Sequence, residues 1–230
     1  MRINAYLALA TGLSRRQADL AIKAGRVTIG GQTASLGQQI GDHHKVTLDG
    51  RTVNPPLTKD LIMLNKPVDF VVSRKGQGGK TVYGLLPPTM RHLKPVGRLD
   101  KDSSGLLLMT NDGHLAFQLT HPSTLKLKKY LVTLNKNLQT SDLKKIRQGI
   151  NLDDGLSRMG IANSSNQNRT MIVSMHEGRN RQIRRTFAAL GYDVIGLHRT
   201  EFAGYKLGNL ASGKWQIISG INNTPIQYRS

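Results

Sequence analysis

The sequence predicts an α+β fold, with a small N-terminal ααβ module followed by a larger domain built on a mixed, mainly antiparallel sheet. Short apolar segments typical of strands recur along the chain, and the helical segments between them do not alternate regularly enough for a doubly wound parallel sheet. A proline pair at 55–56 separates the two parts, because proline neither continues a helix nor donates in a strand ladder. We expect an N-terminal domain over 1–54, a linker over 55–60 and a second domain over 61–230.

Local signals define the elements of the N-terminal module. Apolar residues at helical spacing precede Gly12, which is placed to end a first helix. Ser14 begins the sequence Ser-Arg-Arg-Gln, a capping box that predicts the start of a second helix. Gly30-Gly31 separates two segments typical of strands and therefore predicts a two-residue hairpin turn.

The second domain contains five segments typical of strands. Two of them are almost continuously apolar, which predicts positions in the centre of the sheet. The predicted strands are 61–64, 106–109, 130–134, 170–175 and 215–218, and the predicted helices are 114–119, 141–148 and 181–190.

The charge of the chain indicates a polyanionic partner. Its 230 residues include 33 Lys and Arg against 14 Asp and Glu, a formal net charge of +19. Basic residues alternate with apolar ones in segments typical of folded protein, and no long basic amphipathic helix is present, so nucleic acid is favoured over a membrane surface. The chain has no cysteine, no signal-peptide pattern and no long apolar span, and we expect a cytoplasmic protein without disulfides.

Common catalytic motifs are absent from the sequence. There is no nucleophile elbow, no dinucleotide fingerprint, no Walker loop and no recognisable zinc or calcium motif, so hydrolase, hydride-transfer and metal chemistries lack support. We expect neither a metal site nor a cofactor.

Two polar segments stand out in the second domain. The segment 95–106 turns tightly and presents Asp100 just before an apolar strand, and the segment 177–185 places four arginines within seven residues at the start of a helix. Crowded guanidinium groups repel one another unless a phosphate or a carboxylate lies among them. Two simpler interpretations stay open: Asp100 pairs with Arg98 in an ordinary turn, and the arginines are a solvated helix start.

The N-terminal module resembles the alpha-L RNA-binding domain, which is shared with a protein of the small ribosomal subunit. The matched segments are 2–7, 14–18 and 25–31. The resemblance implies a docking surface for structured RNA. Its basic residues near the helix ends, which are otherwise ordinary solvated side chains, are Arg2, Arg15, Arg16, Lys23 and Arg26.

The larger domain resembles the pseudouridine synthases of the RsuA/RluB type, which modify ribosomal RNA. One departure from the family pattern is Asp69, where a glycine usually follows Lys-Pro. The motifs that carry the resemblance are Leu64-Asn65-Lys66-Pro67, Gly97-Arg98-Leu99-Asp100, 104–113, Lys128–Tyr130, 177–185 and Leu197-His198-Arg199.

The resemblance implies a role for each matched position. Asp100 would be the catalytic nucleophile, Arg184 its ion-pair partner and Tyr130 the ring that stacks on the target base. Ile183 and Leu197 would supply apolar walls. Further substrate contacts would come from five basic residues: Lys66, Arg98, Arg179, Arg181 and Arg185.

The implied reaction converts uridine to its C-glycoside. The N1–C1′ bond breaks, the base rotates and a new bond forms through C5, and a carboxylate can assist by adding to C6 of the base or to C1′ of the ribose; both routes stay open. Asp100 must be ionised, and an opposing guanidinium would offset the effect of burial on its pKa. The target base must leave its stack to be reached. We expect ribosomal RNA as the partner of a monomeric enzyme, with no membrane involved.

Three alternatives remain beside this interpretation. A noncatalytic RNA-binding or ribosome-assembly factor could keep the same fold, although the intact segments around Asp100 and Arg184 count against it. A DNA-binding regulator would account for the charge but not for an acid beside an arginine cluster. A synthase acting on transfer RNA is the third, and the N-terminal module favours the ribosomal branch.

Overall fold

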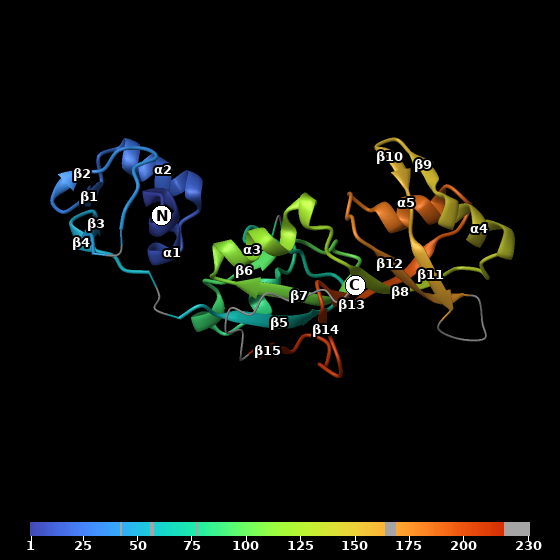
Figure 1. Ribbon diagram of the computed structural model, residues 1–230. Coiled ribbons are helices and arrows are strands. Elements are labelled where there is room, and N and C mark those ends of the chain that lie inside the picture. The colour runs from blue at the N-terminus through green and yellow to red at the C-terminus, as the bar shows by residue number, and fades with distance from the viewer. Residues whose placement is uncertain (42, 56–57, 77, 164–168, 219–230) are drawn as a thin grey trace. The chain divides into compact units, whose positions relative to one another are not determined.

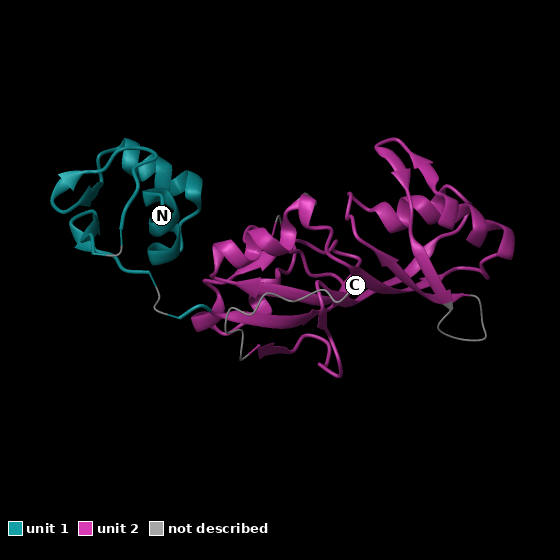
Figure 2. Cartoon of the chain, in the orientation of Figure 1, with its two compact units in different colours: residues 1–59 teal, residues 60–230 magenta. Residues whose placement is uncertain are grey.

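The computed structural model describes residues 1–218 except 42, 56–57, 77 and 164–168. The chain divides into two compact units, Met1–Lys59 and Asp60–Ser230 (Figure 2). Part of the predicted linker, at 56–57, and the C-terminal end of the predicted second domain, at 219–230, lie outside the described residues. The boundary between the units falls within the segment 55–60.

Unit 1 places two helices before a small antiparallel sheet (Figure 1). The strand order is β2-β1-β3-β4. Its elements are α1 (Ile3–Thr11), α2 (Arg15–Lys23), β1 (Val27–Ile29), β2 (Gln32–Thr33), β3 (Val46–Leu48) and β4 (Arg51–Thr52).

The local signals of this unit are confirmed. Gly12 ends α1 in the left-handed region at φ 77°. The Ser14 hydroxyl accepts from the Gln17 backbone N–H at 3.2 Å, and the Gln17 side chain accepts from the Ser14 backbone at 2.9 Å, which completes the capping box. Gly30 and Gly31 have φ values of 58° and 88°, as a two-residue hairpin turn of this twist requires.

Unit 2 is built on a nine-stranded sheet, seven of whose strands follow the order β11-β12-β8-β13-β7-β5-β15. Strand β14 pairs with β13 and β6 with β7, and β9 and β10 form a separate hairpin. Among the described strands, only β13 and β7 pair in parallel, so the predicted mixed, mainly antiparallel sheet is confirmed. The strands are β5 (Leu61–Lys66), β6 (Lys94–Val96), β7 (Ser104–Thr110), β8 (Lys128–Leu134), β9 (Ile150–Leu152), β10 (Gly155–Ser157), β11 (Gly160–Asn163), β12 (Thr170–Met175), β13 (Val194–Phe202), β14 (Tyr205–Lys206) and β15 (Trp215–Ile217).

The apolar strands β5 and β7 form the interior of the sheet, in register from Leu64 opposite Leu107. Alternate residues of the two strands enter different clusters, with Leu64 and Leu107 in the larger core and Met63 and Leu108 in a second one. A strand that packs on both faces needs apolar residues throughout, which explains the unbroken apolar runs of these two segments.

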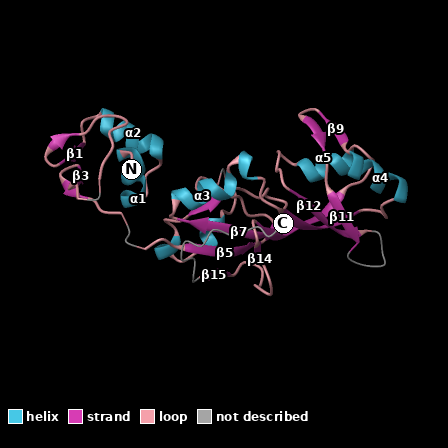
Figure 3. Ribbon diagram, viewed as in Figure 1, coloured by secondary structure: helices cyan, strands magenta, loops and turns pink. Residues whose placement is uncertain are grey.

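Among the described residues of unit 2, three α-helices pack against the sheet (Figure 3): α3 (Gly113–Thr120), α4 (Thr140–Gln148) and α5 (Gln182–Ala188). Single turns of 3-10 helix cover Val82–Leu85, Pro88–Met90 and Pro122–Thr124. Helix α3 lies against β6 and β7, and α5 against β9 and β13. In the described part of the chain, no helix combines the length and apolar character needed to cross a bilayer.

The sequence does not predict β13, although it is the longest strand described. Gly196 interrupts the strand pattern and polar residues follow at 198–201, so the segment shows neither a continuous apolar run nor strict alternation. Register shifts between Val194 and Gly196 and between Arg199 and Glu201 bend the strand against β8. Because β13 lies between β8 and β7, it determines where the segment 197–199 stands.

Candidate active site

The predicted catalytic segments meet at one cleft of about 580 Å³ in unit 2. The turn 97–100, the N-terminal half of β8, the segment 175–183 before and at the start of α5, and the middle of β13 contribute to it. Seven of the predicted site residues line the cleft: Arg98, Asp100, Tyr130, Arg179, Arg181, Ile183 and Leu197.

Asp100 stands on the connection between β6 and β7. Gly97, at φ 72°, allows the chain to reverse after β6, and the Asp100 carbonyl accepts from the Ser103 N–H at 3.1 Å to close the following turn. The carboxylate is 38% exposed and its Oδ2 lies 4.0 Å from Nη1 of Arg181. The interpretation in which Asp100 pairs with Arg98 is wrong, because Arg98 is exposed and the carboxylate faces Arg181 instead.

The structure also corrects the predicted ion pair between Asp100 and Arg184. The Arg184 guanidinium donates to the carbonyls of Asp102 at 2.9 Å and Val194 at 2.6 Å, and its Nε lies 3.2 Å from Oδ2 of Asp102. Arg184 lies within the first turn of α5, where these acceptors occupy its donors. Arg181, predicted as a substrate contact, is therefore the arginine that neighbours Asp100.

Asp102 is the carboxylate that holds this side of the arginine cluster. Arg181 donates to both of its oxygens, at 3.1 and 3.0 Å, in the bidentate geometry that guanidinium and carboxylate favour. Burial by itself raises the pKa of Asp102, but the hydrogen bond from Arg181 and the charges of Arg184 and Arg181 outweigh burial and hold the pKa below its usual value. Asp102 is thus an anion at neutral pH.

The other two arginines of the cluster bind Asp154, in the turn between β9 and β10. Arg185 forms a bidentate pair with its carboxylate at 3.1 and 2.7 Å, and Nη1 of Arg179 donates to Oδ1 at 2.8 Å. Arg179 also donates to the carbonyls of Gly155 and Leu156. The arginines are therefore not a solvated helix start, since carboxylates lie among them, and Arg185 joins α5 to the hairpin rather than lining the cleft.

Lys66, predicted as a substrate contact, is completely buried. Its ammonium donates to the carbonyls of Ser103 at 2.6 Å, Pro67 at 2.9 Å and Lys101 at 3.4 Å, so its donors are directed into the turn that carries Asp100. Burial lowers the pKa of Lys66 to about 8, against the opposing charges of three nearby aspartates. The prediction is wrong because the side chain binds the turn that carries Asp100 from inside the protein and does not line the cleft.

Asp69 occupies a loop position where the family usually has a glycine. Its φ of 66° lies in the left-handed region, which glycine adopts freely and which aspartate tolerates better than most residues. Its N–H donates to the Lys101 carbonyl at 2.8 Å. The loop therefore keeps a conformation suited to glycine, and Asp69 contributes a negative charge near Lys66.

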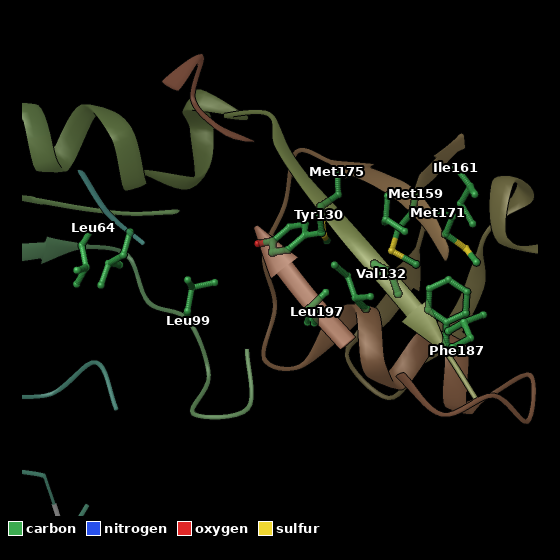
Figure 4. Close-up of a cluster of buried hydrophobic side chains, with 14 of the residues drawn as sticks. Leu64, Leu99, Tyr130, Val132, Met159, Ile161, Met171, Met175, Phe187 and Leu197 are labelled. Atoms are coloured by element: carbon green, nitrogen blue, oxygen red, sulfur yellow. The ribbon is translucent and has the colours of Figure 1, made fainter. Parts of the chain in front are cut away.

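Tyr130, Ile183 and Leu197 form the apolar part of the cleft. Their exposed fractions are 8%, 5% and 9%, and all three belong to the larger core. In Figure 4 the hydroxyl end of Tyr130 points away from Val132 and Phe187, toward the side of the view where Leu99 lies. The ring is thus anchored in the core while the residue also lines the cleft.

Two further cationic residues, Arg199 and Lys128, line the cleft, and the sequence motifs assign a role to neither. Arg199 is only 3% exposed, and its Nε donates to the Leu106 carbonyl at 2.8 Å. Lys128 donates to the carbonyls of His176 at 2.8 Å and Lys126 at 3.1 Å. Both residues belong to motifs of the family resemblance, Leu197-His198-Arg199 and Lys128–Tyr130. The sequence does not predict β13, so it does not show that these two motifs lie on paired strands.

The predicted RNA-binding residues of unit 1 differ in their pairing. Arg26 makes a bidentate pair with Asp49 at 2.7 and 2.6 Å, and Arg15 donates to the Asn4 side chain at 3.1 Å. Arg2, Arg16 and Lys23 are exposed. A shared role of these residues in RNA binding stays a prediction.

Comparisons with known proteins agree with the geometry of unit 2. The family described as RNA pseudouridylate synthase matches residues 60–189. An uncharacterized RNA pseudouridine synthase of Aquifex aeolicus is 35% identical, over 95% of this chain and 90% of its own length. Ribosomal large subunit pseudouridine synthase B of Bacillus subtilis is 33% identical, over 92% and 89%. A solved pseudouridylate synthase structure has a TM-score of 0.68 at 28% identity, over 95% of this chain and 96% of its own.

The chain accordingly belongs to the RNA pseudouridylate synthase family, a class of isomerases. Within that family it is of the RsuA/RluB type, and the resemblance inferred from the sequence motifs is confirmed.

Proposed function

We propose that this chain isomerises a specific uridine of ribosomal RNA to pseudouridine, with Asp100 as the nucleophile and Tyr130 as the stacking platform. The observation that carries the proposal is the meeting of Asp100, Arg181 and Tyr130 at one cleft, within a chain of this family. Relatives that bear ribosomal names, such as the Bacillus subtilis protein, support ribosomal RNA as the substrate.

The surroundings of Asp100 suit a nucleophile that must remain anionic. The carboxylate is partly exposed in the cleft, and Arg181 offers a positive charge at 4.0 Å. An attack by Asp100 forms one bond to C6 of the base or to C1′ of the ribose while the N1–C1′ bond is broken at a later or concurrent step. The base then rotates and C5 bonds to C1′, after which C5 loses its proton, N1 takes up a proton and the carboxylate is released unchanged.

A flipped uridine needs a substitute for its lost stacking in the RNA. Base–aromatic stacking contributes about 1–3 kcal/mol, which is comparable to the few kcal/mol needed to extrude a base. Tyr130 supplies such a face beside apolar Ile183 and Leu197. We place the reaction in the cytoplasm, carried out by a monomer whose unit 1 docks structured RNA through Arg2, Arg16 and Lys23.

The test compares ribosomal RNA from cells that lack the gene with RNA from cells that carry it, using a reagent that marks pseudouridine before reverse transcription. We expect one uridine to gain the mark with the wild-type gene and with Asp153→Asn, an exposed control with the same change of charge. Asp100→Asn should lose the mark while the purified variant binds RNA within a few-fold of wild type. A mark that persists in Asp100→Asn contradicts the assignment, and a wild type that leaves no mark favours a noncatalytic RNA-binding factor.

A further inference from the structure

The four arginines of 177–185 are all paired with carboxylates of the protein. Asp102 binds Arg181 and Arg184, and Asp154 binds Arg179 and Arg185. These guanidinium groups have carboxylate partners within the protein, so an RNA phosphate would have to compete with those partners. The segment that the sequence marks most strongly for anion binding is therefore already occupied by the protein itself.

Arg199 is a buried cation of the cleft with unused donors. Among the described residues only its Nε has an acceptor, the Leu106 carbonyl, and its buried Nη2 has none. A buried donor without an acceptor costs about 1–3 kcal/mol, more for a charged group. A side chain that is 3% exposed and lines the cleft in this state is suited to a ligand that supplies the missing acceptors.

The backbone around Arg199 holds its position firmly. Gly105 of β7 is paired with Arg199 across the parallel strands, and a Cβ at Gly105 would lie 2.3 Å from the Arg199 carbonyl oxygen. The Arg199 guanidinium also stacks on the ring of Phe202, 4.9 Å from its centroid. The guanidinium is thus preorganised, and little rotamer entropy remains to be lost when it binds.

Lys128 brings a second cation to the same place. Its ammonium lies 5.7 Å from the centroid of the same Phe202 ring, and the residue lines the same cleft. Burial and the charge of Arg199 lower the pKa of Lys128, against the opposing effect of Glu177. Two like charges held against one aromatic ring favour the approach of an anion.

Strand register places this pair beside the proposed base platform. Tyr130 is the direct cross-strand partner of Arg199, and Lys128 is the partner of Phe202. Directly opposed residues of an antiparallel pair have Cβ atoms about 4.5–5.5 Å apart. A base on Tyr130 would thus have its own nucleotide backbone within reach of both cations.

We propose that Arg199 and Lys128 form a phosphate subsite that binds a backbone phosphate next to the uridine held on Tyr130. This inference rests on the proposed function, since it takes the cleft to hold a nucleotide. A phosphate provides several acceptor oxygens and a negative charge, which matches the unused N–H groups of Arg199 and the shared positive charge. The uracil base offers carbonyl acceptors but no charge.

Titration of the full chain with mononucleotides, followed by ¹⁵N NMR, tests the subsite without relying on catalysis. The probes are uridine, uridine 5′-monophosphate, uridine 3′-monophosphate and adenosine 5′-monophosphate. We expect at least one uridine monophosphate to bind about tenfold more tightly than uridine. Lys128→Met should reduce that ratio to within twofold, and Lys129→Met should leave it unchanged, because Lys129 pairs with Glu201 at 3.0 Å and does not line the cleft.

Arg199→Met is the second variant. Arg199 is deeply buried, so Lys128→Met carries the test if Arg199→Met fails to fold. Equal affinity of wild type for uridine and its monophosphates overturns the subsite, as does an equal loss in Lys128→Met and Lys129→Met. A phosphate effect that depends on Lys128 in a chain that forms no pseudouridine keeps the subsite and removes the proposed function. Pseudouridine formation without any phosphate effect keeps the proposed function and removes the subsite.

Discussion

Arg184 and Asp102 are joined through both the backbone and the side chain of the aspartate. The Arg184 guanidinium donates to the Asp102 carbonyl at 2.9 Å and places Nε 3.2 Å from the carboxylate, while its other arm reaches the Val194 carbonyl at 2.6 Å. One side chain thus connects the turn after Asp100 to the first residue of β13. This arrangement assigns Arg184 to holding the cleft together and leaves Arg181 beside the proposed nucleophile.

Arg184→Gln should lower the free energy of unfolding by about 1–3 kcal/mol. Most of this loss comes from the two carbonyl hydrogen bonds, because Asp102 is 45% exposed and solvent screens its ion pair. Urea unfolding followed by circular dichroism measures the change. Arg181→Gln is the matched comparison: its side chain is 45% exposed, so stability should fall by less than about 1 kcal/mol while kcat falls at least tenfold. The opposite ranking of the two variants would contradict these roles.

Lys66→Met should change the pH dependence of stability. The pKa of Lys66 is lowered in the folded protein to about 8 from the ordinary 10.5, so between these values the unfolded chain binds more protons and wild-type stability gains with rising pH. This gain in wild-type stability is complete above pH 10.5 and is lost as the pH falls through 8. The unfolding free energy of wild type minus that of the variant should therefore rise by an amount on the order of 3 kcal/mol across this window. A difference that stays flat in urea titrations from pH 7 to 10.5 would exclude the shifted pKa.

Gly105→Ala should be severely destabilising. Its φ is 103°, and the added Cβ would meet the Arg199 backbone at 2.3 Å, so β7 and β13 must separate. We expect a loss above about 4 kcal/mol or failure to fold. Gly113→Ala is the control, because a Cβ there meets nothing within 4 Å. Thermal unfolding compares the two variants. Equal melting temperatures would show that β7 and β13 have room for a Cβ at Gly105.

Tyr130→Phe should retain uridine isomerisation within a few-fold, since it keeps the stacking face. Tyr130→Leu removes the aromatic ring and should lower kcat/KM by roughly 5- to 150-fold, the equivalent of about 1–3 kcal/mol of base stacking. Both variants preserve an apolar side chain at a position that is 8% exposed, which limits the damage to the core. Steady-state kinetics on the RNA substrate compare the two variants. If Tyr130→Leu is as active as Tyr130→Phe, the ring of Tyr130 has no stacking role.

The sequence predicts the parts of the fold that depend on neighbouring residues. The Ser14 capping box and the Gly30-Gly31 turn follow from local chemistry, and the structure contains both. The two continuous apolar segments become the interior strands β5 and β7, because burial on both faces favours apolar residues.

Long-range pairing could not be predicted in the same way. The family resemblance implies that Asp100 and the segment 177–185 share one site, but the arginine it implies as the partner of Asp100 is not the one that neighbours it. Which arginine neighbours Asp100 depends on the left-handed φ of 47° at Arg181 and on where β13 begins, and neither has a clear sequence pattern. The resemblance implies that Lys66 contacts the substrate. Because buried lysines are rare, nothing in the sequence predicts its burial, and only the three-dimensional arrangement shows the backbone carbonyls that accept its hydrogen bonds.

The enclosed ammonium of Lys66 also makes this residue a reporter of motion. Burial lowers the pKa of this amine to about 8, and the side chain is fully covered. An acylating reagent therefore reaches it only when the surrounding turn opens. The rate of acylation at this one position, followed by mass spectrometry, would record how often the loop that carries Asp100 departs from its closed state.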